Sequence, residues 1–143
     1  MSPEENGAAD NLSLLRTRQR EEPIASFMGM ELDELSPGYA RVTMKLRPEY
    51  QNFNGFIFGG IIMALADQSF AYASNSLAYP SVASQFNTHF IASARVGDEL
   101  VAECRVIKNG KRVGISEVTV TNQEGILIAR ATGTTIPVSH NSP

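Results

Sequence analysis

The sequence predicts an α+β fold in which one antiparallel β-sheet wraps around one long central helix, with a short N-terminal helix in front. Two patterns support this prediction. After the glycine pair Gly59-Gly60, apolar residues recur at helical spacing, whereas the flanking segments alternate between apolar and polar residues, as strands with one solvent-facing side do. These strand-like segments are joined by short connections, which favour antiparallel pairing of neighbouring strands.

The chain of 143 residues fits one domain that can bury a real core. We expect residues 1–9 to be a flexible start, residues 10–136 to form the domain, and residues 137–143 to be a flexible tail. Asp10 or Asn11 is expected to cap the short N-terminal helix, which carries several leucines and ends in a run of arginines.

The first two strands follow this helix. Pro23 interrupts the helical run or starts a new turn, and Gly29 is expected to end the small apolar cluster after it. Residues 30–35 are predicted to form a short strand. Apolar and polar residues alternate over residues 39–47, which predicts a strand with one solvent-exposed face. Pro48 ends this strand, because proline has no N–H to donate to a neighbouring strand.

The central helix is expected to start at Gly59-Gly60 and to end before Pro80. A glycine pair is unfavourable inside a helix but is well tolerated at the first residues of one. Many side chains along this helix are small, so a wrapping sheet can approach it closely. The apolar positions at helical spacing are Ile62, Leu65, Ala66, Phe70, Ala73 and Leu77.

Four strands are expected after the helix, over residues 82–90, 99–108, 113–121 and 126–136. Asn109-Gly110 predicts a two-residue hairpin, because both residues tolerate positive φ. One sheet around one helix leaves a flank of the helix and the edges of the sheet open. A homodimer is the simplest way to cover them.

Composition excludes several classes of protein. The chain is 43% hydrophobic and 19% charged, as in an ordinary globular protein, and its net charge of −3 argues against a nucleic-acid binder. The single cysteine, Cys104, allows neither an internal disulfide nor a cysteine metal cluster, and it favours a reducing, cytoplasmic location. The polar N-terminus is unlike a signal peptide, and no apolar run is long enough for membrane insertion.

Asp67 is the candidate chemical centre. It is the only Asp, Glu, Lys or Arg between Tyr50 and Ala94, and an ionised carboxylate avoids apolar surroundings unless something compensates it. Open amides at the helix start could hold a phosphate or stabilise an oxyanion. Asp67 lies roughly 12 Å along the axis from Gly59. The two groups can therefore serve one substrate atom only if Asp67 comes from a second copy of the helix.

Each of these signals also has a simpler explanation. The glycine pair can serve packing or a turn alone, and Asp67 can be an exposed helix residue or a satisfied buried acid. Together, in a segment without other charges, they favour a site.

These residues resemble a known family. The segment with Asn52, Gly55, Gly59-Gly60, Leu65-Ala66-Asp67 and Asn75-Ser76 is similar to the hot-dog-fold acyl-CoA thioesterases, especially their phenylacetate-pathway, PaaI-like branch. The resemblance runs from about Leu12 to Ile136. It implies a hot-dog fold, hydrolysis of an acyl-CoA thioester to free acid and CoA, and a homodimer that assembles into a homotetramer. Coenzyme A is then part of the substrate, and no separate cofactor is expected.

The resemblance also implies roles for individual residues. The backbone N–H of Gly59 binds the thioester carbonyl, and Asp67 of the facing subunit attacks it or activates water. Asn52 matches a position where a polar amide holds the acyl carbonyl or water. Phe58, Gly60 and Gln68 are the other expected substrate-binding residues.

This sequence departs from the family at two positions. The histidine usually found just before the glycine pair is Phe58, and a hydroxyl that some relatives carry one turn after the acid is Ala71. The site is therefore more apolar than usual, and activity is expected to be low, tuned to another substrate, or absent. Two alternatives stay open, a non-catalytic acyl-CoA-binding sensor and a hot-dog hydratase or dehydratase. The second would need a histidine, which the helix segment lacks.

Other possible arrangements of catalytic, metal-binding or ligand-binding residues have less support in the sequence. No Ser-His-Asp arrangement or GxSxG elbow is present, and the only histidines, His89 and His140, are too few for a metal site. His89 is interpreted as a packing or interface residue. The candidates for an acyl pocket are Phe53, Phe56, Phe58, Phe70 and Tyr72, and the candidates for CoA phosphate binding are Arg95, Lys108, Lys111 and Arg112.

Overall fold

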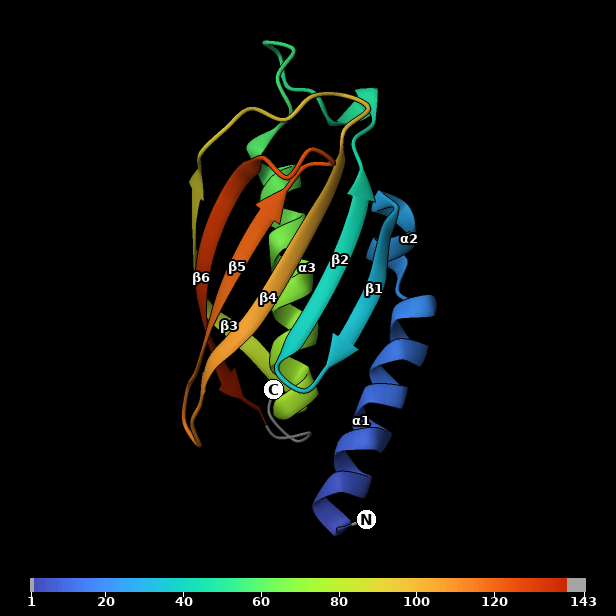
Figure 1. Ribbon diagram of the computed structural model, residues 1–143, viewed down its shortest axis with the longest axis vertical. Coiled ribbons are helices and arrows are strands. Elements are labelled where there is room, and N and C mark those ends of the chain that lie inside the picture. The colour runs from blue at the N-terminus through green and yellow to red at the C-terminus, as the bar shows by residue number, and fades with distance from the viewer. Residues whose placement is uncertain (1, 139–143) are drawn as a thin grey trace.

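The computed structural model describes residues 2–138. A curved antiparallel sheet wraps around one long helix, α3, and two further helices lie beside strand β1 (Figure 1). The sheet has six strands in the order β1-β2-β4-β5-β6-β3. This architecture confirms the predicted α+β fold. The elements are α1 (Pro3–Arg20), α2 (Pro23–Met28), β1 (Met30–Ser36), β2 (Tyr39–Lys45), the 3₁₀ turn η1 (Pro48–Tyr50), α3 (Gly59–Leu77), β3 (Ser81–Phe90), β4 (Glu99–Asn109), β5 (Gly114–Thr121) and β6 (Leu127–Pro137).

The N-terminal helix starts earlier than predicted. The Ser2 side chain accepts a hydrogen bond from the Glu5 N–H, and the Glu5 carboxylate accepts one from the Ser2 N–H, which is a capping box with Pro3 at the first helical position. Residues 3–9, expected to be a flexible start, are therefore helical. Asp10 and Asn11, the predicted caps, lie inside α1, and the Asn11 amide instead donates to the carbonyls of Asn75 and Ser76 at the end of α3, at 2.8 and 3.1 Å.

The C-terminal end differs from its prediction in a smaller way. Pro137, expected to begin a tail, ends β6, and the Val138 N–H donates to the Pro80 carbonyl at 2.9 Å. Residues 139–143, and with them His140, lie outside the described residues. Gly29 ends α2 in the left-handed conformation with φ 70°, as predicted.

Two predictions about strand connections were wrong. The hairpin between β4 and β5 turns over residues 110–113, with Asn109 still paired to Gly114, and Gly110 has no positive φ. The Gly110 N–H instead donates to the Val113 carbonyl at 3.0 Å, so this glycine permits close backbone approach. Strand β3 pairs with β6, not with β4, because residues 91–98 cross over the sheet and bring β4 next to β2.

The core lies between α3 and the concave face of the sheet. Phe70 is 1% exposed, and its ring stacks on Phe86 of β3 at a centroid distance of 5.3 Å. A Cβ on Gly133 of β6 would lie 2.5 Å from the Phe70 ring, so only glycine leaves room for the ring. Phe70 is therefore a core residue and does not line the acyl pocket to which it was assigned.

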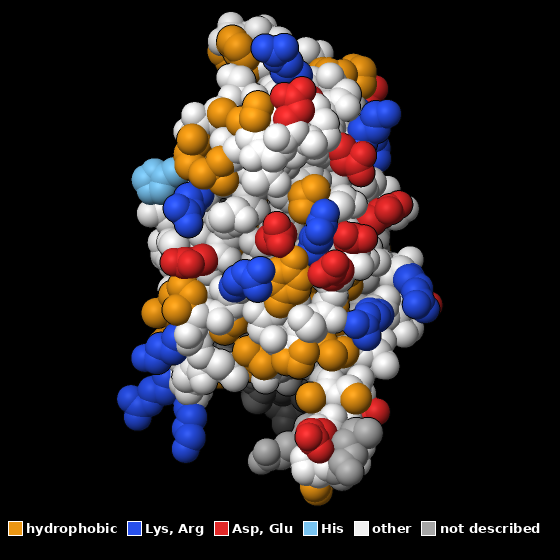
Figure 2. All heavy atoms as spheres, in the orientation of Figure 1, with side chains coloured by type: hydrophobic (Ala, Val, Ile, Leu, Met, Phe, Trp, Pro, Cys, Tyr) orange, Lys and Arg blue, Asp and Glu red, His pale blue; other side chains and the backbone are white. Residues whose placement is uncertain are grey.

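The outer face of the sheet carries charged side chains of both signs (Figure 2). Tyr39 donates to the Glu103 carboxylate at 2.6 Å, and the Arg105 guanidinium lies over the Tyr39 ring at 4.7 Å. None of the six residues predicted as catalytic or substrate-binding (Asn52, Phe58, Gly59, Gly60, Asp67 and Gln68) belongs to a strand of this sheet. Among the described residues, no helix has both the length and the apolar character needed to cross a bilayer.

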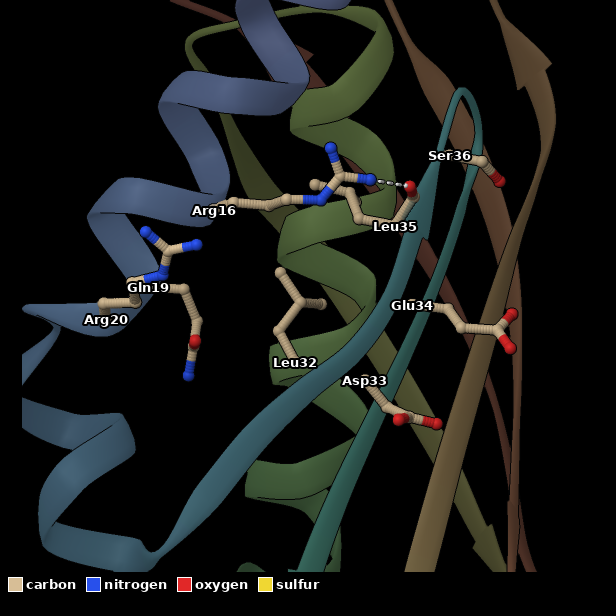
Figure 3. A pocket seen from close by; sticks show the side chains of 8 residues that line it. All are labelled: Arg16, Gln19, Arg20, Leu32, Asp33, Glu34, Leu35 and Ser36. Carbon is tan, nitrogen blue, oxygen red and sulfur yellow. Dashed lines mark hydrogen bonds between the residues drawn. The ribbon is translucent and has the colours of Figure 1, made fainter.

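The two edge strands of the sheet, β1 and β3, differ in how far other parts of the chain cover them. A pocket of ≈ 380 Å³ lies between α1 and β1 (Figure 3). Across it, Arg16 donates to the Leu35 carbonyl at 2.7 Å, and Gln19 donates to the Met30 carbonyl at 3.3 Å. Helix α1 thus satisfies part of the β1 edge. Strand β3, at the other edge, is largely exposed and is the edge available for pairing with another chain.

Candidate active site

The start of α3 presents two open backbone amides. Phe58 is the N-cap, and its own N–H donates to the Tyr50 carbonyl at 2.8 Å, while the Ile61 N–H bonds back to the Phe58 carbonyl at 2.9 Å. Among the described residues, no acceptor is found for the N–H of Gly59 or Gly60. The first turn contains no acidic residue, so the positive end of the helix dipole is not neutralised there.

An apolar pocket of ≈ 320 Å³ opens at this helix tip, and we call it the tip pocket. Aromatic rings lie close to both glycines: a Cβ on Gly59 would sit 3.1 Å from the Phe90 ring, and one on Gly60 would sit 2.7 Å from the Phe58 ring. The glycines therefore let the rings cover the backbone beside the open amides. The tip pocket is lined by Phe56, Ile57, Gly59, Ile62, Phe90, Ile91, Ala92, Ser93 and Ala94.

Asp67 lies two turns further along α3, on the strip of the helix that its own sheet leaves uncovered. The side chain is exposed on the single chain, and no hydrogen bond or ion pair is found for it among the described residues. Surrounding apolar groups nevertheless remove water from the carboxylate, and this desolvation raises its pKa. The strip consists of Met63, Ala64, Asp67, Ala71 and Asn75, which are exposed or half-buried, whereas the helix residues between them are buried.

The structure gives Asn52 a local role. Its side-chain oxygen accepts hydrogen bonds from the Asn54 N–H at 2.9 Å and the Phe56 N–H at 3.2 Å. Asn52 thereby fixes the shape of the loop that leads into α3, directly before the tip pocket. Phe53, in the same loop, is 94% exposed.

Gln68 points away from Asp67. Its side chain is buried and donates to the carboxylate of Glu22, which also accepts a 2.7 Å hydrogen bond from the Tyr72 hydroxyl. The desolvated hydroxyl beside Glu22 has a raised pKa. This contact between the start of α2 and α3 was missed by sequence reasoning. An acid directly before Pro23 was its only local signal.

The structure thus brings Phe58, Gly59 and Gly60 together at the helix tip, places Asn52 in the adjoining loop, and separates them from Asp67 and Gln68 along α3. Within one chain, Asp67 is roughly 12 Å along the axis from Gly59. The distance expected from the sequence is retained, because α3 is continuous from Gly59 to Leu77.

The described residues do not support a metal site, a catalytic histidine or a cysteine nucleophile. They contain no group of three or more His, Cys, Asp or Glu side chains that could hold a metal ion. His89 is exposed on β3, opposite Arg130. Cys104 is buried, and burial raises its pKa to about 12, so its thiol is not a nucleophile at neutral pH.

Comparison with known proteins identifies the family. The model described as the thioesterase superfamily matches residues 54–129, more than half of the chain, from the loop before α3 into β6. The chain belongs to the thioesterase superfamily. Acyl-coenzyme A thioesterase PaaI of Escherichia coli is 32% identical over 105 residues, which are 73% of this chain and 75% of that protein.

Two solved structures extend the comparison to the fold. The PaaI protein from the phenylacetic acid degradation operon of E. coli superposes with a TM-score of 0.85 at 28% identity, over 92% of this chain and 94% of that chain. A Streptococcus mutans protein solved with bound acetyl CoA gives a TM-score of 0.74 at 29% identity, over 77% of this chain and 89% of that chain. The predictions of a hot-dog fold, of the PaaI-like branch and of a thioester-hydrolysing enzyme are thereby confirmed.

Proposed function

We propose that this chain hydrolyses an acyl-CoA thioester to the free acid and CoA. The Gly59 N–H of one subunit polarises the thioester carbonyl, and Asp67 of a second copy is the nucleophile or the general base. The observation that carries this proposal is an uncompensated carboxylate of raised pKa on the uncovered strip of a helix whose tip has open amides. The acyl-CoA names of the relatives supply the substrate class.

The proposed assembly is a homodimer with two equivalent sites. Strand β3 is the uncovered edge of the sheet, and Phe90, 53% exposed at its end, borders the Gly59 tip. Pairing of two β3 strands would carry each Asp67 strip toward the tip of the other chain and cover both. We further propose that such dimers associate into a homotetramer and that the protein works in the cytoplasm.

The chemistry requires few groups. In the general-base form, Asp67 takes a proton from a water molecule as its oxygen attacks the carbonyl carbon. The resulting oxyanion is stabilised by the N–H of Gly59 and the positive end of α3. Collapse of this intermediate breaks the carbon–sulfur bond, and the CoA thiolate leaves without strong acid assistance. No separate cofactor takes part in this proposal.

The position of Arg95 favours it as a contact for the CoA phosphates. It directly follows Ala94 of the tip pocket, in the segment that crosses over at the α3 N-terminal end of the molecule (Figure 1). The β4–β5 hairpin, whose strand end and turn carry Lys108, Lys111 and Arg112, lies at the opposite end, near the α3 C-terminus (Figure 1). Within one chain, Arg95 is therefore the candidate cation nearest in the fold to the Gly59 tip.

The raised pKa of Asp67 predicts a pH dependence. As base or nucleophile Asp67 must be ionised, so kcat/KM falls as pH falls through its raised pKa. The acidic limb of the profile is therefore expected above the ordinary Asp pKa of about 3.9. A pH profile measured with a fixed acyl-CoA tests this. A limb at or below the ordinary value would mean that Asp67 is not desolvated in the working enzyme.

Release of free thiol from a panel of acyl-CoAs, followed with a thiol reagent, is the direct test of the function. The proposal predicts turnover with at least one member. The presence of Phe58 where the family usually has histidine favours one rival, a sensor that binds acyl-CoA without turnover. Saturable binding of the same acyl-CoAs with no thiol release would support the sensor and contradict the enzyme.

A further inference from the structure

A second cavity borders the Asp67 strip. This cavity, which we call the side pocket, has a volume of ≈ 290 Å³ and lies between α1 and the C-terminal half of α3. Ala71 lines it, and Ala71 is one helical turn after Asp67, where side chains are neighbours about 5–6 Å apart. The full lining is Leu15, Arg18, Glu22, Ala71, Tyr72, Asn75, Tyr79, Pro80 and Ser81.

Most polar groups in this lining are already bound to protein. The two Glu22 oxygens accept from Gln68 and Tyr72. The Asn75 amide donates to the Ala71 carbonyl at 2.8 Å and accepts from the Ser81 N–H at 2.8 Å. These groups have little capacity left for a ligand, so apart from the exposed Arg18 on its α1 side the side pocket mainly offers carbon surface to whatever enters it.

Ser81 marks the far end of the side pocket. Its N–H donates to the Asn75 side chain at 2.8 Å, and Asn75 lies two turns along α3 from Asp67, which is roughly 12 Å. The Ser81 hydroxyl has almost no accessible surface, so it is not available to a ligand in this pocket.

The thioester has two arms, and the two cavities differ in which arm they suit. The tip pocket adjoins the open amides of α3 and the segment that leads to Arg95, so it suits the thioester carbonyl and the phosphate-bearing CoA arm. The side pocket has carbon walls that suit an acyl chain. Across the proposed dimer, the tip pocket of one chain and the side pocket of its twin would meet at the reacting carbonyl.

We infer that the side pocket holds the far part of the acyl group and that Ala71 sets the acyl length accepted. The inference rests on the proposed function. The preferred substrate is then an acyl group of medium length, about as long as the path from Asp67 to the Ser81 end of the pocket. Ala71 is a specificity residue here because a larger side chain at its position would close the path.

A graded series at one position tests the length limit. Ala71→Ser, Ala71→Val and Ala71→Met are compared with the parent for acetyl-, hexanoyl- and decanoyl-CoA by thiol release. We expect the serine variant to keep the parental profile. With valine and then methionine, kcat/KM for decanoyl-CoA should fall at least tenfold relative to acetyl-CoA. An unchanged ratio in a folded Ala71→Met enzyme would overturn the inference.

The length limit and the proposed function fail in distinguishable ways. Failure of the length limit appears as an unchanged ratio of decanoyl-CoA to acetyl-CoA hydrolysis in an active enzyme. Failure of the proposed function looks different, because the parent would then release no thiol from any substrate.

Discussion

Replacing Asp67 with asparagine is expected to lower kcat by about 10²–10⁴-fold, the usual contribution of a positioned acid–base group. Asparagine keeps the size of the side chain but can neither accept the proton of water nor attack the carbonyl. Acyl-CoA binding should be retained, because the open amides and both pockets are unchanged. Thiol release and a binding titration on the same preparation measure the two effects separately.

Folding is not expected to explain the loss. A raised pKa means that the folded chain holds the Asp67 proton more tightly than the unfolded chain does. Ionisation therefore costs folding stability as pH rises from the ordinary Asp pKa through the raised one. Asparagine removes that cost, so the Tm at neutral pH should equal or exceed that of the parent. Asp33→Asn, which breaks the exposed 3.2 Å pair with Arg41, serves as a control that should keep full activity. A fully active Asp67→Asn enzyme would contradict the mechanism.

The second large effect is expected at Gly59. Proline is well tolerated as the first residue of a helix, and it removes the N–H. The preceding Phe58 has φ −59° and ψ 126°, a conformation that suits a residue before proline. Gly59→Pro is therefore expected to keep α3 and to lower kcat by about 10²–10³-fold, the cost of losing one oxyanion donor.

Gly59→Ala provides the matched control. Both substitutions add a Cβ about 3.1 Å from the Phe90 ring, but only proline removes the amide hydrogen. Alanine should therefore retain much more activity than proline. Equal losses in kcat for the two variants would assign the effect to crowding against Phe90 and would exclude the Gly59 N–H as the oxyanion donor.

The elements that follow local rules were predictable from the sequence. Alternation placed β2, and small and apolar residues at helical spacing placed α3 between Gly59-Gly60 and Pro80. The αL glycine at position 29 ended α2 as expected. The capping box at Ser2 and Glu5 is a local signal too, and it marks Pro3 as the start of α1.

Other features depend on contacts between distant residues. No local pattern shows that residues 91–98 cross the sheet and leave β3 at the edge. The same holds for the contact of Glu22 with Gln68 and Tyr72, because it joins helices far apart in the sequence. For the site, the glycine pair and the lone acid were visible in the sequence. The two cavities were not, since each is built from several elements.

The decisive measurement mixes two inactive chains. A chain carrying Asp67→Asn and a chain carrying Gly59→Pro are co-expressed, and the heterodimer is verified by native mass spectrometry. If each site takes its helix tip from one subunit and its carboxylate from the other, a heterodimer contains one intact site, and random mixing restores roughly a quarter of parental thiol release. Activity no higher than that of either variant alone, with heterodimer present, would show that the two groups do not act across subunits.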